Sequence, residues 1–380
     1  MNNLRLQQGI LNRIGTFDNF CALIFAVFSF CYCCFYQNDI WAAAIYKLLG
    51  VSWTYADGAW ALLITLLLVF LQRQMYKKRF QGKDKHLFLS FIPSLLTLIV
   101  LSNFSLLVLD LESRFGISIF LIGHYLVYVK KEKNKEDDKS IVVMTYYQHY
   151  KTLLLMGAYM FTVCVVANTK DTTMYSLRME RHILQGEYDK ALSVGKRSLS
   201  NDSTLLALRV YSLLQEGKLG ERLFDYPIAP FADIIKTIDN KASAFILPSS
   251  FIQNYLEKEK KLLYQYEQNK GMVSRTSILN NAYLNIQLAK FLMNKDLAAF
   301  VATINQYDLT SQRLPKHYSE ALILYNHLTS QPKVSFKNNV LDTDYEDFQS
   351  LKSKYTHPML RNNCLRDVYG NTYWYYYYCL

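Results

Sequence analysis

Few residues in this 380-residue chain have the types and spacing that catalysis or metal binding requires. His317 and Glu320 stand at i and i+3 of a predicted helix, a pair that more often makes a surface hydrogen bond than a site. Cys31, Cys33 and Cys34 offer soft thiolate ligands, but they lack a second ligand pair. The chain contains no Gly-rich phosphate loop, His-Glu-x-x-His helix or Gly-x-Ser-x-Gly elbow. We therefore expect no catalytic residue, metal or cofactor.

His124 is the most interior polar residue of an apolar run. Ionisable groups inside a membrane usually mark a proton or substrate path when several of them face one cavity. Asp57, Asp110 and Glu112 all fall near the ends of apolar runs, so His124 has no evident buried charged partner. A hydrogen-bonded structural histidine is the favoured interpretation, and a transport path is the alternative.

Five long apolar runs in the first 170 residues would position these side chains. About 20 apolar residues suffice to cross a hydrocarbon core of ~30 Å. We therefore expect residues 1–170 to form a bundle of about five transmembrane helices, with residues 40–52 along the membrane interface. The expected spans are Phe17–Tyr36, Trp53–Gln72, Leu87–Leu109, Leu111–Val129 and Thr152–Thr169.

The net charge of +11 indicates a membrane topology more than a nucleic-acid surface. Thirteen Lys and Arg residues lie in the N-terminal tail and in loops 73–86 and 130–149, against Lys47 and Arg114 in the alternate loops. Since positive loops stay cytoplasmic, the N-terminus is expected there, and an odd span count places the remainder on the other side. A miscount by one span would reverse that side. No basic face or aromatic–basic ladder suggests a nucleic-acid partner.

Residues 171–380 change to amphipathic helices separated by Gly, Asn, Asp and Pro. Gly186, Tyr188 and Ala191 have the spacing of the tetratricopeptide repeat. In that repeat, the glycine makes the turn between two helices, the tyrosine packs between them and the alanine allows close approach. This segment is therefore predicted to be a second, helical-repeat domain.

Later segments repeat this rhythm more weakly. Gly217 follows a second predicted helix, and Tyr318 and Ala321 repeat the spacing of the first tyrosine and alanine. Helical pairs that bury their apolar stripes only against neighbours build a curved solenoid. The predicted fold is all-α, a membrane bundle followed by a tetratricopeptide-like α-solenoid, with an irregular helical domain as the alternative.

The aromatic segment that contains Tyr373, Trp374 and Tyr375 has three interpretations. Its rings could pack inward and cap the last helices, lie at a membrane interface, or contact a ligand. We treat these three residues as candidate interface aromatics. Cys364 and Cys379 could form a disulfide if this domain is extracytoplasmic.

Four segments together resemble an uncharacterised family of Bacteroidota integral membrane proteins with a tetratricopeptide-like C-terminal region. The resemblance covers mainly residues 150–380. It implies a bacterial inner-membrane protein with a periplasmic domain, and it brings no established activity and no catalytic residues. The segments are residues 175–180 (YSLRME), 217–226 (GKLGERLFDY), 314–322 (LPKHYSEAL) and 370–376 (GNTYWYY).

The sequence thus predicts a membrane-anchored scaffold whose helical-repeat domain binds a protein or peptide on the periplasmic side. Its partners would be membrane lipid and that protein or peptide. The alternative is a small transporter or a membrane-embedded enzyme with its site among the transmembrane helices. A lipid- or glycan-modifying enzyme would need its carboxylates clustered at the outer face.

Overall fold

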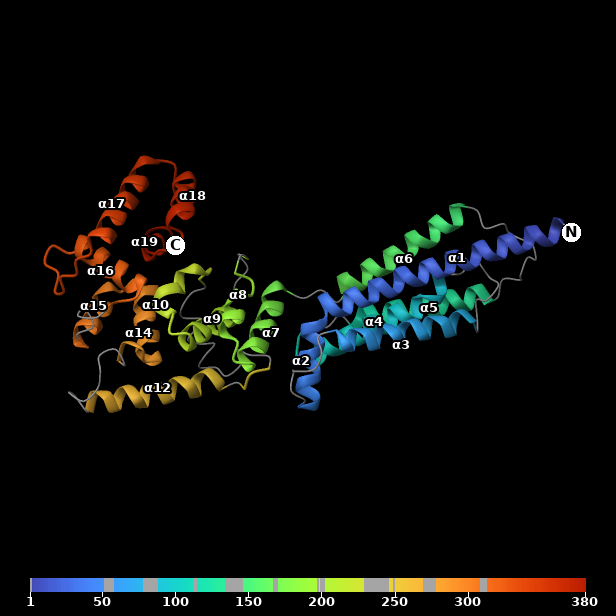
Figure 1. Cartoon of the computed structure of the whole chain (residues 1–380), viewed down its shortest axis with the longest axis horizontal. Helices are drawn as coiled ribbons and strands as arrows, with labels where there is room; N and C mark the ends of the chain where they lie inside the picture. The colour runs from blue at the N-terminus through green and yellow to red at the C-terminus, as the bar shows by residue number, and fades with distance from the viewer. Residues whose placement is uncertain are drawn as a thin grey trace. The chain divides into compact units, whose positions relative to one another are not determined.

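The computed structural model describes most of the chain as helices joined by short turns (Figure 1). Every regular element among the described residues is helical, which confirms the predicted all-α class. Two compact units are present, Met1–Lys170 and Asp171–Leu380. The described residues are 2–50, 58–77, 88–111, 115–133, 146–166, 170–196, 198, 202–228, 246–248, 250–268, 278–307 and 313–380.

The first unit is a bundle of long helices. In Figure 1, α1, α3, α4, α5 and α6 run side by side, and the shorter α2 crosses them at one end. The central α4 contacts α2, α3, α5 and α6. The elements are α1 Asn2–Cys31, the π-helix η1 Tyr32–Tyr36, α2 Asn38–Leu49, α3 Ala59–Met75, α4 Ile92–Val108, α5 Phe115–Lys133 and α6 Tyr146–Val166.

Three helices in the described residues are long and apolar enough to cross a membrane: Phe17–Tyr36, Phe88–Val108 and His149–Val166. The sequence predicted five, so this count corrects the expectation. The second and fourth predicted spans correspond to shorter apolar helices, Ala59–Met75 and Gly116–Val127. At ~1.5 Å per residue, the 17 residues of α3 extend only about 25 Å, short of a ~30 Å hydrocarbon core. Part of the second predicted span lies outside the described residues.

Neutral hydrogen bonds join the helices of the bundle through the polar residues of α4. The Tyr32 hydroxyl and Ser102 Oγ lie 3.2 Å apart. Asn103 Nδ2 donates to Ser118 Oγ on α5, also at 3.2 Å. Such bonds stabilise helix contacts where no water is available. The outer surface is apolar by contrast: α3 exposes Leu62, Leu63, Leu66, Leu67 and Phe70.

The second unit consists of shorter helices around one core. Buried leucines, alanines and aromatic side chains from α7 through α19 form this core. Its elements are α7 Asp171–Leu184, α8 Tyr188–Ser193, α9 Ser203–Gln215, α10 Leu219–Arg222, the 3-10 helix η4 Leu223–Asp225, α12 Phe251–Gln268, α14 Ala282–Met293, α15 Leu297–Gln306, α16 Lys316–Leu328, α17 Asn339–Lys354, α18 Pro358–Tyr369 and α19 Tyr373–Cys379.

Three turns of the second unit share one hydrogen-bond pattern. Gly186, Gly217 and Lys295 each adopt a left-handed conformation, with φ of 72°, 65° and 58°. In every case this residue donates its amide to the carbonyl three residues earlier, and the following amide donates to the carbonyl five residues before itself. This is the Schellman ending of a helix, and the next helix begins two residues after it. Three pairs, α7–α8, α9–α10 and α14–α15, are therefore built alike.

Candidate functional site

A groove on the second unit is the strongest candidate for a binding site. It encloses about 500 Å³ and is formed by α12, α14 and the residue that ends α15. Aromatic, amide and charged side chains of both signs share its walls. The lining residues are Glu257, Lys260, Lys261, Leu263, Tyr264, Gln265, Glu267, Tyr283, Gln287 and Tyr307.

Glu259 fixes α12 against the start of α14. Its Oε2 accepts hydrogen bonds from Asn281 Nδ2 and from the Ala282 amide, both at 3.2 Å. Asn281 in turn caps α14 by accepting from the Leu284 amide at 3.0 Å. A carboxylate is favourable at this place because the first amides of a helix have no partners within the helix. The apolar side of α12 packs inward through Ile252 and Leu263. Leu263 lies at the floor of the groove, and the charged side chains of α12 form its wall.

A short hydrogen bond joins two of the residues that line the groove. The Tyr307 hydroxyl donates to Glu267 Oε1 at 2.5 Å. Burial, reinforced by this neighbouring carboxylate, raises the pKa of Tyr307 above its ordinary value of 10.0. The phenol therefore stays protonated at neutral pH and holds Glu267 in place as an acceptor.

The other walls offer aromatic rings and cations to a ligand. Lys260 Nζ lies 5.7 Å from the centroid of the Tyr283 ring, within the range of a cation–π contact. The Tyr264 side chain is 62% exposed at the groove, and Lys261 lies beside it. Such walls present aromatic rings together with a few polar and charged groups, as ligand-binding pockets commonly do. Among the described residues, no three His, Cys, Asp or Glu side chains are grouped so that they could hold a metal.

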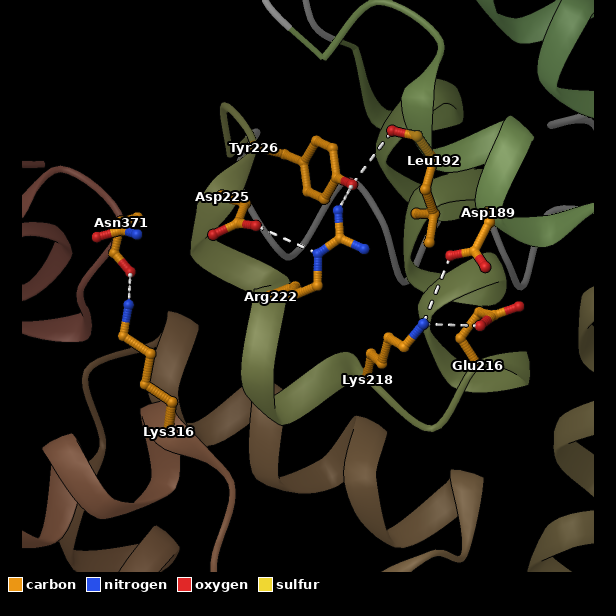
Figure 2. A network of polar contacts seen from close by, with 9 residues as sticks. All are labelled: Asp189, Leu192, Glu216, Lys218, Arg222, Asp225, Tyr226, Lys316 and Asn371. Carbon is orange, nitrogen blue, oxygen red and sulfur yellow. Dashed lines mark hydrogen bonds and ion pairs between the residues drawn. The ribbon is translucent and has the colours of Figure 1, made fainter.

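Polar contacts connect the first two helical pairs (Figure 2). Lys218 Nζ donates to Glu216 Oε2 at 2.9 Å and lies 3.5 Å from Asp189 Oδ1 of the preceding pair. Arg222 donates to Tyr226, whose hydroxyl donates to the Leu192 carbonyl, both at 3.2 Å. This network crosses from one pair to the next, so it orients the pairs and need not bind a ligand.

Arg209 is completely buried beneath this network. Its guanidinium lies 5.0 Å from the centroid of the Tyr226 ring and donates to the Gly195 carbonyl at 3.3 Å. Burial lowers the pKa of Arg209 from its ordinary value. The cation is enclosed by protein groups and has no open face for an external anion.

The predicted repeat-packing residues lie at the core. Gly186 makes the left-handed turn between α7 and α8, and Ala191 is fully buried beside it. Tyr188 is partly buried, with its ring edge-on to Tyr211 at 6.3 Å. Gly217 makes the corresponding turn after α9.

The second predicted tyrosine and alanine also lie in the core. Tyr318 and Ala321 are both buried on α16. The Tyr318 hydroxyl donates to Asn285 Oδ1 at 2.7 Å, which joins α16 to α14. Its ring also lies against Gly220 of α10, where an added Cβ would approach the Tyr318 Cζ to 3.0 Å. These residues hold helices together and do not contact the groove.

His317 and Glu320 are brought together, but in the core and not at the surface. His317 Nδ1 lies 3.0 Å from Glu320 Oε2, and both side chains are at most 1% exposed. The same carboxylate oxygen accepts from the Tyr373 amide at 2.8 Å. The expected surface hydrogen bond is therefore a buried one, because α19 covers this side of α16.

The remaining candidates are not among the residues that line the groove. Tyr373, Trp374 and Tyr375 are all buried, and Trp374 Nε1 donates to the Glu320 carbonyl at 2.8 Å. Their rings pack inward. Cys364 and Cys379 are both free thiols. His124 is exposed on α5 and forms no hydrogen bond or ion pair with any described residue.

The groove itself was missed by sequence reasoning. Its charged run on α12, from Glu257 to Lys261, reads as an ordinary solvated helix face. Tyr283 and Tyr307 come from other helices, so only the fold brings them to this face. The tyrosine at Tyr264 on that charged face was the available signal, since large aromatic side chains are concentrated in binding surfaces.

Together these features define a protein whose described residues form apolar helices long enough to span a membrane and a separate helical unit that carries a groove. Residues 257–380 match a family described as a family of unknown function (DUF6057). The match agrees with the expected similarity to an uncharacterised family. No curated protein and no solved structure matches the chain. Every residue that lines the groove falls within the matched segment.

Proposed function

We propose that this chain is a membrane-anchored interaction protein whose C-terminal unit binds a segment of another protein in the α12–α14 groove. The observation that carries the proposal is the groove itself, in which an exposed tyrosine lies among cations and hydrogen-bonding side chains. The three like-built helical pairs support a tetratricopeptide-like module, because such modules bind peptides along their helices.

The proposed setting is the bacterial inner membrane. The basic loops on one side of the apolar runs favour a cytoplasmic N-terminus and a periplasmic C-terminal unit. We further propose that α3 and α5 cross the bilayer with the three longer helices, since all five run side by side and expose leucine and phenylalanine outward. Reporter fusions in loop 78–87 and after Lys170 should then report opposite sides of the membrane. Fusions that report the same side would contradict this topology.

The groove is tested by site-specific photo-crosslinking in intact cells. A photo-reactive amino acid at Tyr264 faces the groove, whereas one at Lys258 lies on the same helix outside it. We expect a discrete crosslinked product from position 264 that is weaker or absent from position 258. Equal products from both positions, or none from position 264, would contradict groove binding.

Matched charge variants show whether that product depends on groove chemistry. Lys261 lines the groove, and Lys258 on the same helix does not. Lys261→Ala should lower crosslinking from position 264 by about tenfold, the effect of a ~1.4 kcal/mol contact, while Lys258→Ala should leave it unchanged. Equal effects of the two substitutions would indicate general surface charge and not a specific site.

A further inference from the structure

Four charged side chains in the groove form no ion pair with any described residue. They follow one another along α12 as Glu257, Lys260, Lys261 and Glu267. Glu257 and Lys261 even stand at the i and i+4 spacing at which ion pairs form on a helix, yet they do not pair with each other. Charges of both signs are therefore available to a ligand, and their order along the helix is acidic, basic, acidic.

Glu267 is the charge that the fold orients. The Tyr307 hydroxyl donates to its Oε1 at 2.5 Å, and the side chain is partly buried. Its second oxygen, Oε2, accepts no hydrogen bond from a described residue. Tyr264 stands three residues earlier on the same face of the helix and exposes its ring in the groove. A carboxylate beside an aromatic ring is a favourable site for a cation, which can form an ion pair and contact the ring face.

Lys260 and Lys261 form the oppositely charged part of the groove. Lys260 lies over the Tyr283 ring, a contact that does not neutralise its charge. Lys261 precedes Glu267 by six residues, which corresponds to about 9 Å along the helix axis. An extended segment covers that length in about three residues, at ~3.3 Å each. One short segment can therefore present an acidic group to Lys261 and a basic group to Glu267 at the same time.

We propose that the segment bound in the groove pairs a basic side chain with Glu267 and, about three residues away, an acidic side chain with Lys261. This inference rests on the proposed function, because it specifies the chemistry of the protein segment that the groove binds. Opposite charges at two points select the partner, since a segment of one charge sign is repelled at one of them. They also select its direction, because a reversed segment brings like charges together.

The test uses the full-length chain in intact cells, with a photo-reactive amino acid at Gln265, which lines the groove and leaves Tyr264 in place. Glu267→Gln removes the charge but keeps an oxygen that can accept from Tyr307. It should lower the crosslinked product about tenfold. Glu346→Gln, which removes an exposed carboxylate on α17, is the control and should leave the product unchanged. An undiminished product with Glu267→Gln, or an equal loss with both substitutions, would overturn the proposal.

The crosslinked product supplies a second measurement. Mass spectrometry should identify a protein segment with a lysine or arginine and, about three residues away, an aspartate or glutamate. Replacing that basic residue by glutamine should also lower the product about tenfold. Combined with Glu267→Gln it should cause little further loss, because both substitutions remove the same contact. Losses that multiply, a segment without a basic residue, or a lipid or glycan in place of a protein would overturn the proposal.

The inference and the proposed function can be distinguished when they fail. The absence of a product from both positions 264 and 265 would refute groove binding itself, and with it this inference. A product that is insensitive to Glu267→Gln would leave groove binding intact and refute only the charge pairing. Limited proteolysis of the C-terminal unit should give the same fragments with Glu267→Gln as with the native chain, which shows that the variant folds.

Discussion

The Glu320 carboxylate on α16 accepts a hydrogen bond from the backbone amide of Tyr373 at 2.8 Å. This bond ties the start of α19 to a side chain 53 residues earlier in the chain. The same oxygen is the partner of His317 Nδ1. A single buried side chain therefore lies within hydrogen-bond distance of both the Tyr373 amide and the His317 imidazole.

Glu320→Ala should destabilise the C-terminal unit by about 3 kcal/mol, because it leaves a buried amide and a buried imidazole without their acceptor. Glu346→Ala, on the exposed side of α17, is the matched control and should change stability by less than about 0.5 kcal/mol. Urea unfolding of the purified full-length chain, followed by limited proteolysis of the C-terminal unit, measures both. Similar midpoints for the two variants would show that the bond at Glu320 is dispensable.

Removing one hydroxyl from each of two buried tyrosines should have opposite effects. Tyr373 buries its hydroxyl without a hydrogen-bond partner among the described residues, so Tyr373→Phe should stabilise the unit by about 1 kcal/mol. Tyr318 donates to Asn285 at 2.7 Å, so Tyr318→Phe should destabilise it by about 1 to 2 kcal/mol. Thermal unfolding of the two variants side by side is the measurement. A loss of stability in both would mean that the Tyr373 hydroxyl does have a partner.

The left-handed turn at Lys295 should carry measurable backbone strain. A residue with a Cβ costs about 1 kcal/mol in this conformation relative to glycine. Lys295 also lies 5.6 Å from the Tyr376 ring centroid, so its side chain contributes independently. Lys295→Gly and Lys295→Ala lose that contact equally, and the glycine variant should be the more stable by about 1 kcal/mol. Equal stabilities would indicate that the turn relaxes when the side chain is removed.

The C-terminal unit should lose stability in alkaline solution. Burial raises the pKa of Tyr318 and Tyr373 above the ordinary value of 10.0. An unfolded tyrosine ionises near pH 10 while the folded one stays protonated. The stabilisation is therefore fully present below pH ~10 and is lost as the pH rises towards the folded pKa, by ~1.4 kcal/mol per pH unit for each tyrosine. Absorbance at 295 nm should show these phenols ionising only together with unfolding. Gradual ionisation in the folded state would contradict this.

Some features of the fold follow directly from local sequence. The glycines at Gly186 and Gly217 mark helix ends because few other residues adopt a positive φ without strain. The third turn of the same kind was not found, since Lys295 carries no such signal and is recognisable only from its hydrogen bonds. Apolar run length predicted the long helices of the first unit, but it counted α3 and α5 as full spans, although their apolar stretches are shorter.

Other features depend on contacts that no local pattern contains. The aromatic residues of α19 had three open interpretations, because a tyrosine suits a core, an interface or a ligand site equally well. Their burial depends on the hydrogen bond from the Tyr373 amide to Glu320 and on the helices against which α19 packs. The groove depends likewise on Glu259, which sets α12 against α14. Contacts of this kind, between residues far apart in the chain, could not be predicted from local sequence patterns.

The packing of α19 also has a mechanical consequence. In a linear array of helical pairs each pair touches only its neighbours, so the array can unravel from one end. Here the Tyr376 ring lies 5.0 Å from Phe224, next to the second helical pair, and its hydroxyl donates to the Met293 carbonyl at the end of α14 at 2.6 Å. One short helix thus contacts segments that are far apart in the sequence of the unit. Under a force applied to its ends, the whole unit should therefore unfold in one step, and the helical pairs should not unfold one after another.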